Sequence, residues 1–352
     1  MPVLVTPKNV LKKPPSVSPR PRGGPVIIRT SERRDFKRCV WRWHMGWRQG
    51  LRPFRDSNPL WFGQGIHLAL AEWYLLGQER GPHPVKTWKK YIAGESSRIA
   101  TVDWNTEDEK RINLLDLGEE MMSNYVDFYG TDDHTSTIAI EQPFQVSIFD
   151  PDDPNTLLAI FAGTFDGVYR DNRTGEIWLW EHKTAASIQT NHLPMDDQAG
   201  GYWLVADTIL REKGLIGPDE FISGIMYNFL LKRHRDTRPR NEQGLYLNKN
   251  GSISKNQPKP LFERVPVYRT PGERDTQLRR IADELKVMQA FRGQERLPLI
   301  KNPTRDCSWD CSFYKMCQLN EQGEDGDWQA FRESAYSRRD PYADHRENRK
   351  SA

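Results

Sequence analysis

The sequence predicts an α/β fold with helical additions on both sides of a strand region. Apolar residues recur at helical spacing before Tyr129 and again after Asp196. Between Thr137 and Thr184, short segments rich in β-branched and aromatic residues alternate with Asp, Pro, Asn and Gly turns. With 12 Trp, 12 Tyr and 14 Phe among 352 residues, the chain has enough bulky apolar material for a large core.

The expected elements can be placed in order along the chain. The first helix begins near the candidate N-cap Ser31, because Phe36, Val40, Trp43 and Trp47 are spaced by four, three and four residues and so share one face. A polar hairpin turning at Asn250-Gly251 is also expected. Further helices are predicted over 63–76, 107–129, 196–211 and 271–292, and strands over 137–149, 157–170, 176–184 and 221–231.

Positive charge is concentrated in local segments, although the net charge of the chain is only +3. Eight basic residues lie between Glu32 and Arg55 against two acidic ones. A second cluster, Lys232–Arg240, holds five basic residues and Asp236. Both segments could neutralise phosphates, and both could be ordinary solvated surface, so charge alone leaves the two interpretations open.

Three charged residues stand out in the strand region. Glu181 and Lys183 are two residues apart on an apolar strand and therefore point to the same face, while Asp166 lies in the preceding strand. Such charges need compensation, either by an ion pair or by a divalent cation held by Asp166 and Glu181. Oxygen ligands suit Mg²⁺ or Mn²⁺, and a metal with a neighbouring lysine is what phosphodiester hydrolysis requires.

These residues carry a resemblance to a known family. Gly163-x-x-Asp166 followed by Glu181-x-Lys183 resembles the catalytic core of the PD-(D/E)XK nuclease superfamily, in its RecB-like branch. The resemblance implies a restriction-endonuclease-like mixed sheet flanked by helices, and Phe165 replaces the proline that names the superfamily. In that branch the two acidic residues bind the metal and the lysine supports the attacking water.

Two further motifs extend the resemblance. Gln198-x-x-x-Tyr202 matches a helical motif of the branch that contacts DNA, and its spacing puts both residues on one helix face. Gly63-x-x-x-His67 matches an upstream helix whose histidine is an additional metal ligand. The resemblance therefore implies that His67 binds the metal and that His182 contributes only its backbone carbonyl.

The four cysteines suggest a second inorganic group. Three of them, Cys307, Cys311 and Cys317, lie within eleven residues, and Cys39 lies far upstream. In a reducing compartment this pattern favours a metal over disulfides, and the residues leave Zn²⁺ and a [4Fe–4S] cluster open. The arrangement resembles the iron–sulfur staple of AddB-type and CRISPR-associated exonucleases, except that three residues rather than two separate Cys307 from Cys311.

The basic residues around Cys39 are then expected to bind DNA beside the site. The predicted contacts are Arg33, Arg34, Lys37, Arg38 and Arg42. Trp43 and Trp47 are expected to pack in the core, whereas Trp41 is left open between packing and stacking on unpaired bases.

Together these features predict a metal-dependent DNA exonuclease acting in recombination, repair or phage DNA processing. Its substrate would be DNA with a free end or single-stranded DNA. A structure-specific endonuclease and an inactive DNA-binding subunit are the alternatives. No Walker A pattern occurs, so a helicase or recombination partner would be a separate chain. No membrane span is expected, and the protein is placed in the cytoplasm, or in the host cytoplasm if phage-encoded.

The predicted organisation is a single nuclease domain, 31–322, between two tails. The domain divides into a helical part (31–130), a catalytic core (137–270) and a C-terminal helix with the cysteine staple (271–322). Residues 1–30 are Pro-rich and basic and are expected to be disordered, and 323–352 form a polar tail.

Overall fold

The computed structural model describes residues 26–54, 58–99, 106–292, 300–323 and 326–343. The predicted N-terminal tail therefore lies almost wholly outside the described residues. The chain forms two compact units: unit 1 comprises Met1–Phe54 with Val287–Ala352, and unit 2 comprises Arg55–Lys286. Within the described parts, none of the helices has the length and apolar character needed to cross a bilayer.

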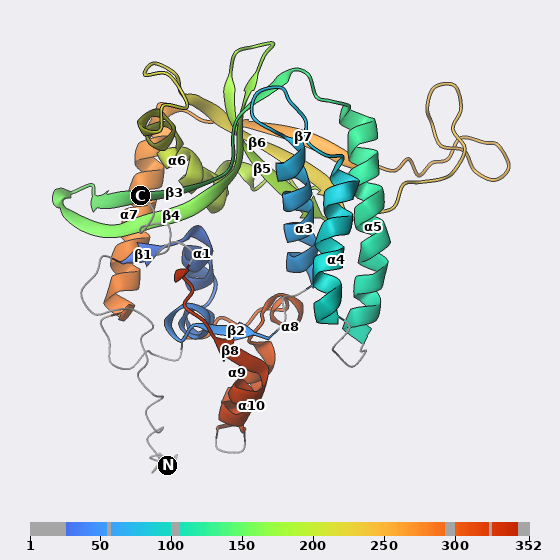
Figure 1. The fold of residues 1–352 in the computed structure, drawn as a ribbon. Coiled ribbons are helices and arrows are strands. Elements are labelled where there is room, and N and C mark those ends of the chain that lie inside the picture. Colours follow the sequence, from blue (N-terminus) through green and yellow to red (C-terminus); the bar gives the residue numbers. More distant parts are fainter. Residues whose placement is uncertain (1–25, 55–57, 100–105, 293–299, 324–325, 344–352) are drawn as a thin grey trace. The chain divides into compact units, whose positions relative to one another are not determined.

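Unit 2 is built on a mixed β-sheet (Figure 1). Strands β4, β5, β6 and β7 are neighbours in that order, and β3 pairs with β4. The β5–β6 pair is parallel and the β3–β4, β4–β5 and β6–β7 pairs are antiparallel. The strands are β3 (Thr135–Asp150), β4 (Asp153–Asp171), β5 (Ile177–Ala185), β6 (Ile222–Leu231) and β7 (Phe262–Tyr268).

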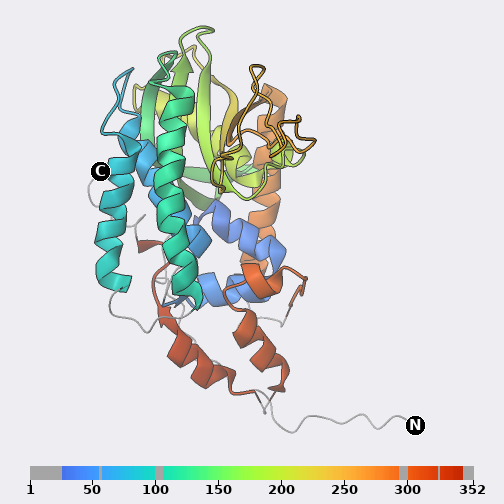
Figure 2. The same cartoon turned by 90° about the vertical axis from the view of Figure 1, so that its right-hand side faces the viewer.

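Helices pack against this sheet. Figures 1 and 2 show α3 (Asn58–Trp73), α4 (Pro84–Ile99) and α5 (Thr106–Tyr129) side by side. Their apolar residues join Trp178, Trp180 and Phe262 of the strands in one buried cluster. The alternation of β5 directs Trp178 and Trp180 into this cluster and Leu179 and Glu181 to the opposite face, where α6 (Asp197–Glu212) lies. Helix α7 (Pro271–Arg292) follows β7.

Unit 1 joins the two ends of the chain. Strand β2 (Leu51–Pro53) pairs with β8 (Tyr336–Arg338), and a small core contains Trp41, Met45, Phe313 and Tyr336. The remaining elements are β1 (Ile27–Ile28), α1 (Thr30–Arg38), α2 (Val40–Trp43), the π-helix η1 (His44–Arg48), α8 (Cys307–Asp310), α9 (Tyr314–Glu321) and α10 (Trp328–Ala335).

A buried carboxylate links both ends of the chain inside unit 1. Glu32 of α1 is fully buried and accepts hydrogen bonds from the Trp43 indole at 3.0 Å, from Arg292 and from the hydroxyl of Tyr342. Tyr342 has no exposed surface. These contacts satisfy a charge that would otherwise be costly to bury.

Some sequence expectations need correction. The first helix does not run through Trp47: it ends at Arg38, because Cys39 is extended, and its N-cap is Arg29 rather than Ser31. Helix α4 and strand β7 were not predicted. The described part of the segment expected to be a polar tail is ordered, because Trp328, Phe331 and Tyr336 contact the core of unit 1 despite their polar neighbours.

Candidate active site

Three carboxylates occupy neighbouring positions on adjacent strands of unit 2. In the β3–β4 pair, Ile140 lies opposite Gly167 and Gln142 opposite Phe165, so the register puts Glu141 opposite Asp166. The β4–β5 pairing ends at Gly167 opposite Trp180, and the next position would match Asp166 with Glu181. Like charges opposite each other destabilise a sheet, so this row favours a bound cation.

Asp166 lies where β4 and β5 separate. Its Oδ2 accepts a hydrogen bond from the backbone N–H of His182 at 2.8 Å, which replaces the lost strand pairing. Burial alone would raise the pKa of Asp166, but His67 and the hydrogen bond from His182 outweigh burial and lower it to about 2. Asp166 is therefore a carboxylate at any physiological pH and is available as a metal ligand.

His67, Glu141 and Asp166 form a candidate metal site. One nitrogen or oxygen atom from each residue lies within 4.8 Å of the chosen atoms of the other two. Among the described His, Cys, Asp and Glu residues, no other group of three meets this criterion. The two carboxylates are ligands that suit Mg²⁺ or Mn²⁺. Glu141 has a φ of 41°, a costly backbone conformation for a non-glycine residue.

Sequence reasoning missed Glu141. Its position near the metal depends on the register between two strands, which no local motif encodes. The only available signal was an acidic residue among the alternating apolar residues of the predicted strand 137–149.

Glu181 and Lys183 form a partly buried ion pair. Lys183 Nζ donates to Glu181 Oε1 at 2.6 Å, and the Glu181 side chain is only 4% exposed. Burial raises the pKa of Glu181 to about 7. Burial alone would lower the pKa of Lys183, but the charges of Glu181 and Asp196 outweigh it and raise the pKa. Lys183 therefore stays a cation and can donate hydrogen bonds but not act as a base.

The two histidines differ in charge. Burial opposes the protonated form of His67, yet Asp166, Glu181 and Glu141 raise its pKa to about 9. Its Nε2 lies 3.1 Å from the carbonyl oxygen of His182 and its Nδ1 3.5 Å from Asp166 Oδ1. Burial lowers the pKa of His182 to about 3, so that ring is neutral and its Nδ1 accepts from Asn228 at 2.9 Å. The His182 ring therefore faces away from the carboxylates and only its carbonyl lies on their side.

Tyr202 borders the same site from α6. It lies close to Glu181 and Phe165, and its ring packs edge-on against Phe144 with 5.4 Å between centroids. Gly163 makes this packing possible, because a Cβ there would lie 2.8 Å from the Tyr202 ring. Gln198 is half-buried in the first turn of α6, one turn before Tyr202.

A buried polar network begins at the His182 ring, on the side away from the carboxylates. Asn228 donates to the Tyr125 hydroxyl at 3.1 Å, and Tyr125 and Tyr74 are joined at 2.8 Å. Tyr74 donates to Asp132, which has no exposed side-chain surface and which Arg264 holds with two hydrogen bonds, at 3.0 and 2.6 Å. None of these residues was predicted, because the network joins distant helices and strands.

The four cysteines all belong to unit 1 and none is in a disulfide. Burial raises the pKa of Cys311, and the neighbouring Cys307 and Cys39 add to the effect. Burial likewise raises the pKa of Cys317, with contributions from Cys39 and Cys311. The thiols are thus close enough to influence one another's ionisation.

The basic residues around Cys39 divide into two groups. Arg33 is buried, with 1% of its surface exposed, so it cannot reach a phosphate and we remove it from the expected DNA contacts. Arg38 pairs with Asp310, and Arg42 pairs with Asp35 at 2.9 Å. Arg34 and Lys37 are exposed. Trp41, Trp43 and Trp47 are all buried, which leaves none of them available for base stacking.

The mixed sheet and its flanking helices define a restriction-endonuclease-like α/β fold, and the acidic group lies on its central strands. A family model of the PD-(D/E)XK nuclease superfamily matches residues 30–318, and the chain belongs to this superfamily. Its members are typically metal-dependent nucleases. No curated protein sequence matches the chain.

Metal binding is expected to release protons. His67 must lose the proton that its raised pKa of about 9 retains, and Glu141 and Glu181, each with a pKa of about 7, must be ionised. The affinity for Mn²⁺ should therefore rise as pH increases from 6 to 8, with about one proton released per metal at pH 7.5. Calorimetric titrations in buffers of different ionisation enthalpy measure this release.

The matched control is His67→Ala, which should bind Mn²⁺ more weakly and release fewer protons. Equal proton release by this variant and the natural protein would contradict a metal-binding role for His67.

Proposed function

We propose that this chain is an Mg²⁺- or Mn²⁺-dependent DNA exonuclease with a [4Fe–4S] cluster, acting in DNA recombination, repair or processing. The observation that carries the nuclease assignment is the group of His67, Glu141 and Asp166 beside the Glu181–Lys183 pair. The Gln198-x-x-x-Tyr202 and Gly63-x-x-x-His67 motifs of the RecB-like branch support exonuclease activity.

The chain's own residues have distinct roles in this proposal. Asp166, Glu181 and His67 bind the metal, as the family motifs imply, and Glu141 lies close enough to join them, with the His182 carbonyl beside them. A bound divalent cation would polarise the scissile phosphoryl group and lower the pKa of a water molecule. Lys183, held as a cation by Glu181, orients that water and stabilises negative charge in the transition state. Gln198 and Tyr202 position the DNA strand.

Glu181 has two roles that follow from its pKa. In the metal-free protein it is paired with Lys183 and partly protonated near pH 7. Once ionised, it can share its charge between Lys183 and the metal, which keeps the lysine beside the reacting phosphate. Arg34 and Lys37 remain the candidates of unit 1 for contacts to the phosphate backbone.

The described thiols do not form a compact tetrahedral zinc site. Four thiolates at about 2.3 Å from a tetrahedral Zn²⁺ would all lie within about 4 Å of one another. No three of the described cysteine sulfurs lie within 4.8 Å of one another. A [4Fe–4S] cluster is larger than a single ion and spreads its four thiolate ligands further apart.

End-labelled and circular DNA test the exonuclease assignment. Linear single- and double-stranded DNA should be degraded with Mg²⁺ or Mn²⁺, whereas a covalently closed single-stranded circle should persist. Equal rates on circle and linear strand would favour the endonuclease, and no cleavage of any DNA would favour an inactive DNA-binding subunit.

Iron analysis tests the cluster. Protein purified without oxygen should be brown and hold about four irons per chain. Cys39→Ser should lose iron as fully as Cys317→Ser does. A colourless protein with one zinc per chain would replace the cluster by zinc.

A further inference from the structure

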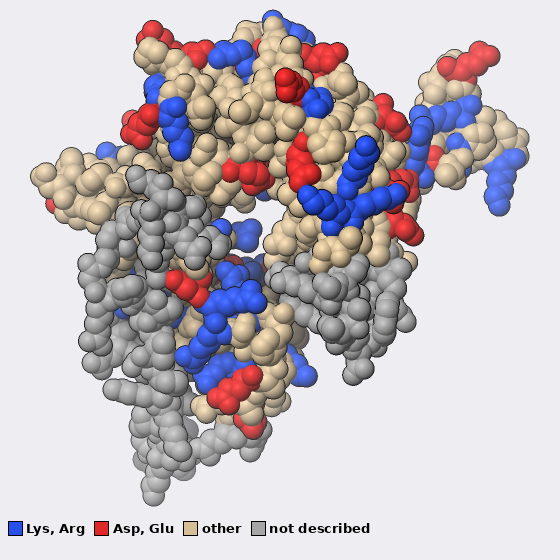
Figure 3. Space-filling view, in the orientation of Figure 1, with Lys and Arg blue, Asp and Glu red and all other residues tan. Residues whose placement is uncertain are grey.

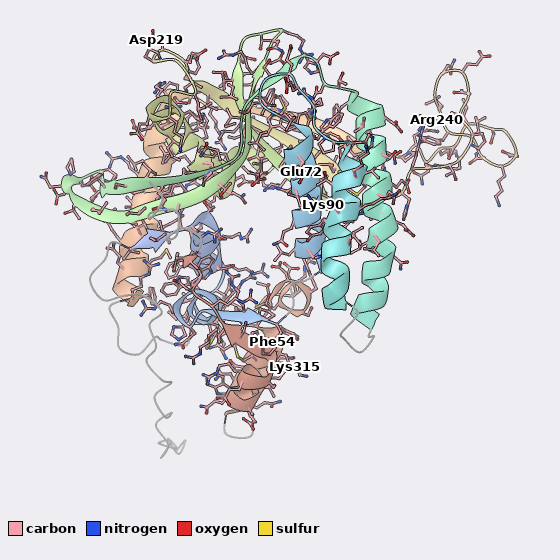
Figure 4. The ribbon with its side chains drawn as sticks, in the orientation of Figure 1. Phe54, Glu72, Lys90, Asp219, Arg240 and Lys315 are labelled. Atoms are coloured by element: carbon pink, nitrogen blue, oxygen red, sulfur yellow. The ribbon has the colours of Figure 1, made fainter. Side chains whose placement is uncertain are left out.

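Unit 2 carries a long connection between β6 and β7, Lys232–Leu261, which we call the arm. Antiparallel neighbours are usually joined by about two to five residues, so this connection is far longer than pairing requires. Figure 1 shows it extending away from α5 on the side opposite the sheet, and Figure 4 labels Arg240 on it. The length of this connection therefore suggests a function beyond joining the two strands.

The arm is internally ordered. Bridges join Arg240 to Tyr246 and Leu247 to Ile253. The side chain of Gln257 bonds both the N–H and the carbonyl of Tyr246, at 2.8 and 3.0 Å, and Ser254 N–H donates to the same carbonyl at 2.8 Å. These bonds give the arm a fixed form without a core of its own.

Its base is fixed to α5. Glu120 accepts the backbone N–H of Arg235 at 2.7 Å and pairs with His234. Arg235 thereby uses its backbone for attachment while its guanidinium remains exposed.

The net positive charge of the arm is larger than that of the entire chain. It contains eight Lys and Arg residues against Asp236 and Glu242, whereas the whole chain has a net charge of +3. Asp236 is already engaged by Arg238 at 2.6 Å. Among the described residues, the side chains of Arg235, Lys249 and Lys255 are exposed and have no ion pair. Figure 3 shows the Lys and Arg side chains on this projection.

The chemistry of the arm suits phosphates rather than unpaired bases. Proteins that hold single strands combine positive charge with exposed aromatic rings. The arm's one aromatic residue, Tyr246, is 9% exposed and is covered by Arg240 and Arg238, at 4.3 and 5.2 Å from its ring centroid. A fixed array of cations without a stacking surface matches the dense, regular charge of a duplex backbone.

We propose that the arm binds the phosphate backbone of double-stranded DNA and so holds the duplex on unit 2. This inference rests on the proposed nuclease function, because it assigns the arm to the same substrate. The proposal adds a contact to duplex DNA that is separate from the candidate metal site and from Lys183.

The test compares two triple variants of equal charge change. R235Q/K249Q/K255Q removes three exposed cations from the arm, and K86Q/K90Q/K213Q removes three exposed lysines elsewhere in unit 2. Affinity for a 30-base-pair duplex is measured without divalent metal, so that the DNA stays intact, at several salt concentrations. Each phosphate contact contributes about 0.9 to the slope of log K against log salt, so the arm variant should lose about 2.7 from the slope.

Each outcome decides the proposal. A shallower slope and weaker duplex binding in the arm variant alone support it. An unchanged salt slope in the arm variant would overturn the proposal and would favour an acidic protein as the partner of the arm. Equal losses of duplex affinity in both variants would also overturn it, because net charge alone would then explain the effect. Cleavage of a short single-stranded oligonucleotide by the natural protein tests the nuclease function separately, so the arm proposal can fail while that function stands.

Discussion

Asp166→Asn is expected to reduce DNA cleavage about a thousand-fold or more. Asparagine keeps the size of the side chain and an oxygen that can accept the His182 N–H bond, but it removes the one site carboxylate whose pKa is lowered, to about 2. Loss of a metal ligand costs several kcal/mol of transition-state stabilisation, and about 4 kcal/mol corresponds to 10³-fold in rate. Initial rates on end-labelled DNA with Mg²⁺ or Mn²⁺ measure the effect.

Asp219→Asn provides the matched control. Asp219 is exposed on the loop between α6 and β6 (Figure 4) and should tolerate the same chemical change without loss of activity. Cleavage by Asp166→Asn at the rate of the natural protein would contradict the assigned site, provided that both variants unfold at the same temperature.

Arg264→Met is expected to destabilise the protein by about 3–5 kcal/mol. The substitution removes the guanidinium that pairs with Asp132, whose side chain has no exposed surface, and leaves only weaker partners such as the Tyr74 hydroxyl for that buried charge. It also removes the guanidinium packed 3.8 Å from the Tyr129 ring centroid. Urea titration followed by fluorescence gives the free energy of unfolding.

Two further variants separate the causes. Arg279→Met breaks an ion pair whose side chains are 63% and 69% exposed, and it should change stability by less than about 1 kcal/mol. Adding Asp132→Asn to Arg264→Met should restore part of the lost stability, since the buried charge is then removed as well. A double variant no more stable than Arg264→Met would assign the loss to packing instead.

The strands that carry Asp166, Glu181 and Lys183 could be predicted because their signals are local. The two-residue spacing of Glu181 and Lys183 sets their common face whatever the rest of the fold does. The mixed sheet and its flanking helices agree with the predicted fold class. The family match confirms the superfamily that the motif of Asp166, Glu181 and Lys183 indicated. The roles of these three residues stay predictions.

Features that depend on tertiary contacts escaped prediction. Glu141 approaches Asp166 through strand register, and Asp132 meets Arg264 across a large sequence separation. Arg33 belongs to a basic run typical of an exposed helix face, yet the fold buries it. Charge composition describes a segment but does not determine which of its side chains face water.

The buried Glu32 has a consequence for the biogenesis of the protein. Unit 2 is continuous in sequence, whereas unit 1 needs both Glu32 and Tyr342. At about 5–20 residues per second, a ribosome needs roughly ten to fifty seconds to synthesise Arg55–Lys286 between the two parts of unit 1. Unit 2 can therefore fold during translation, before Cys307, Cys311 and Cys317 have been synthesised to join Cys39. Any cofactor bound by all four thiols can be completed only after the whole of unit 2 has been synthesised, and interrupted synthesis would release unit 2 without it.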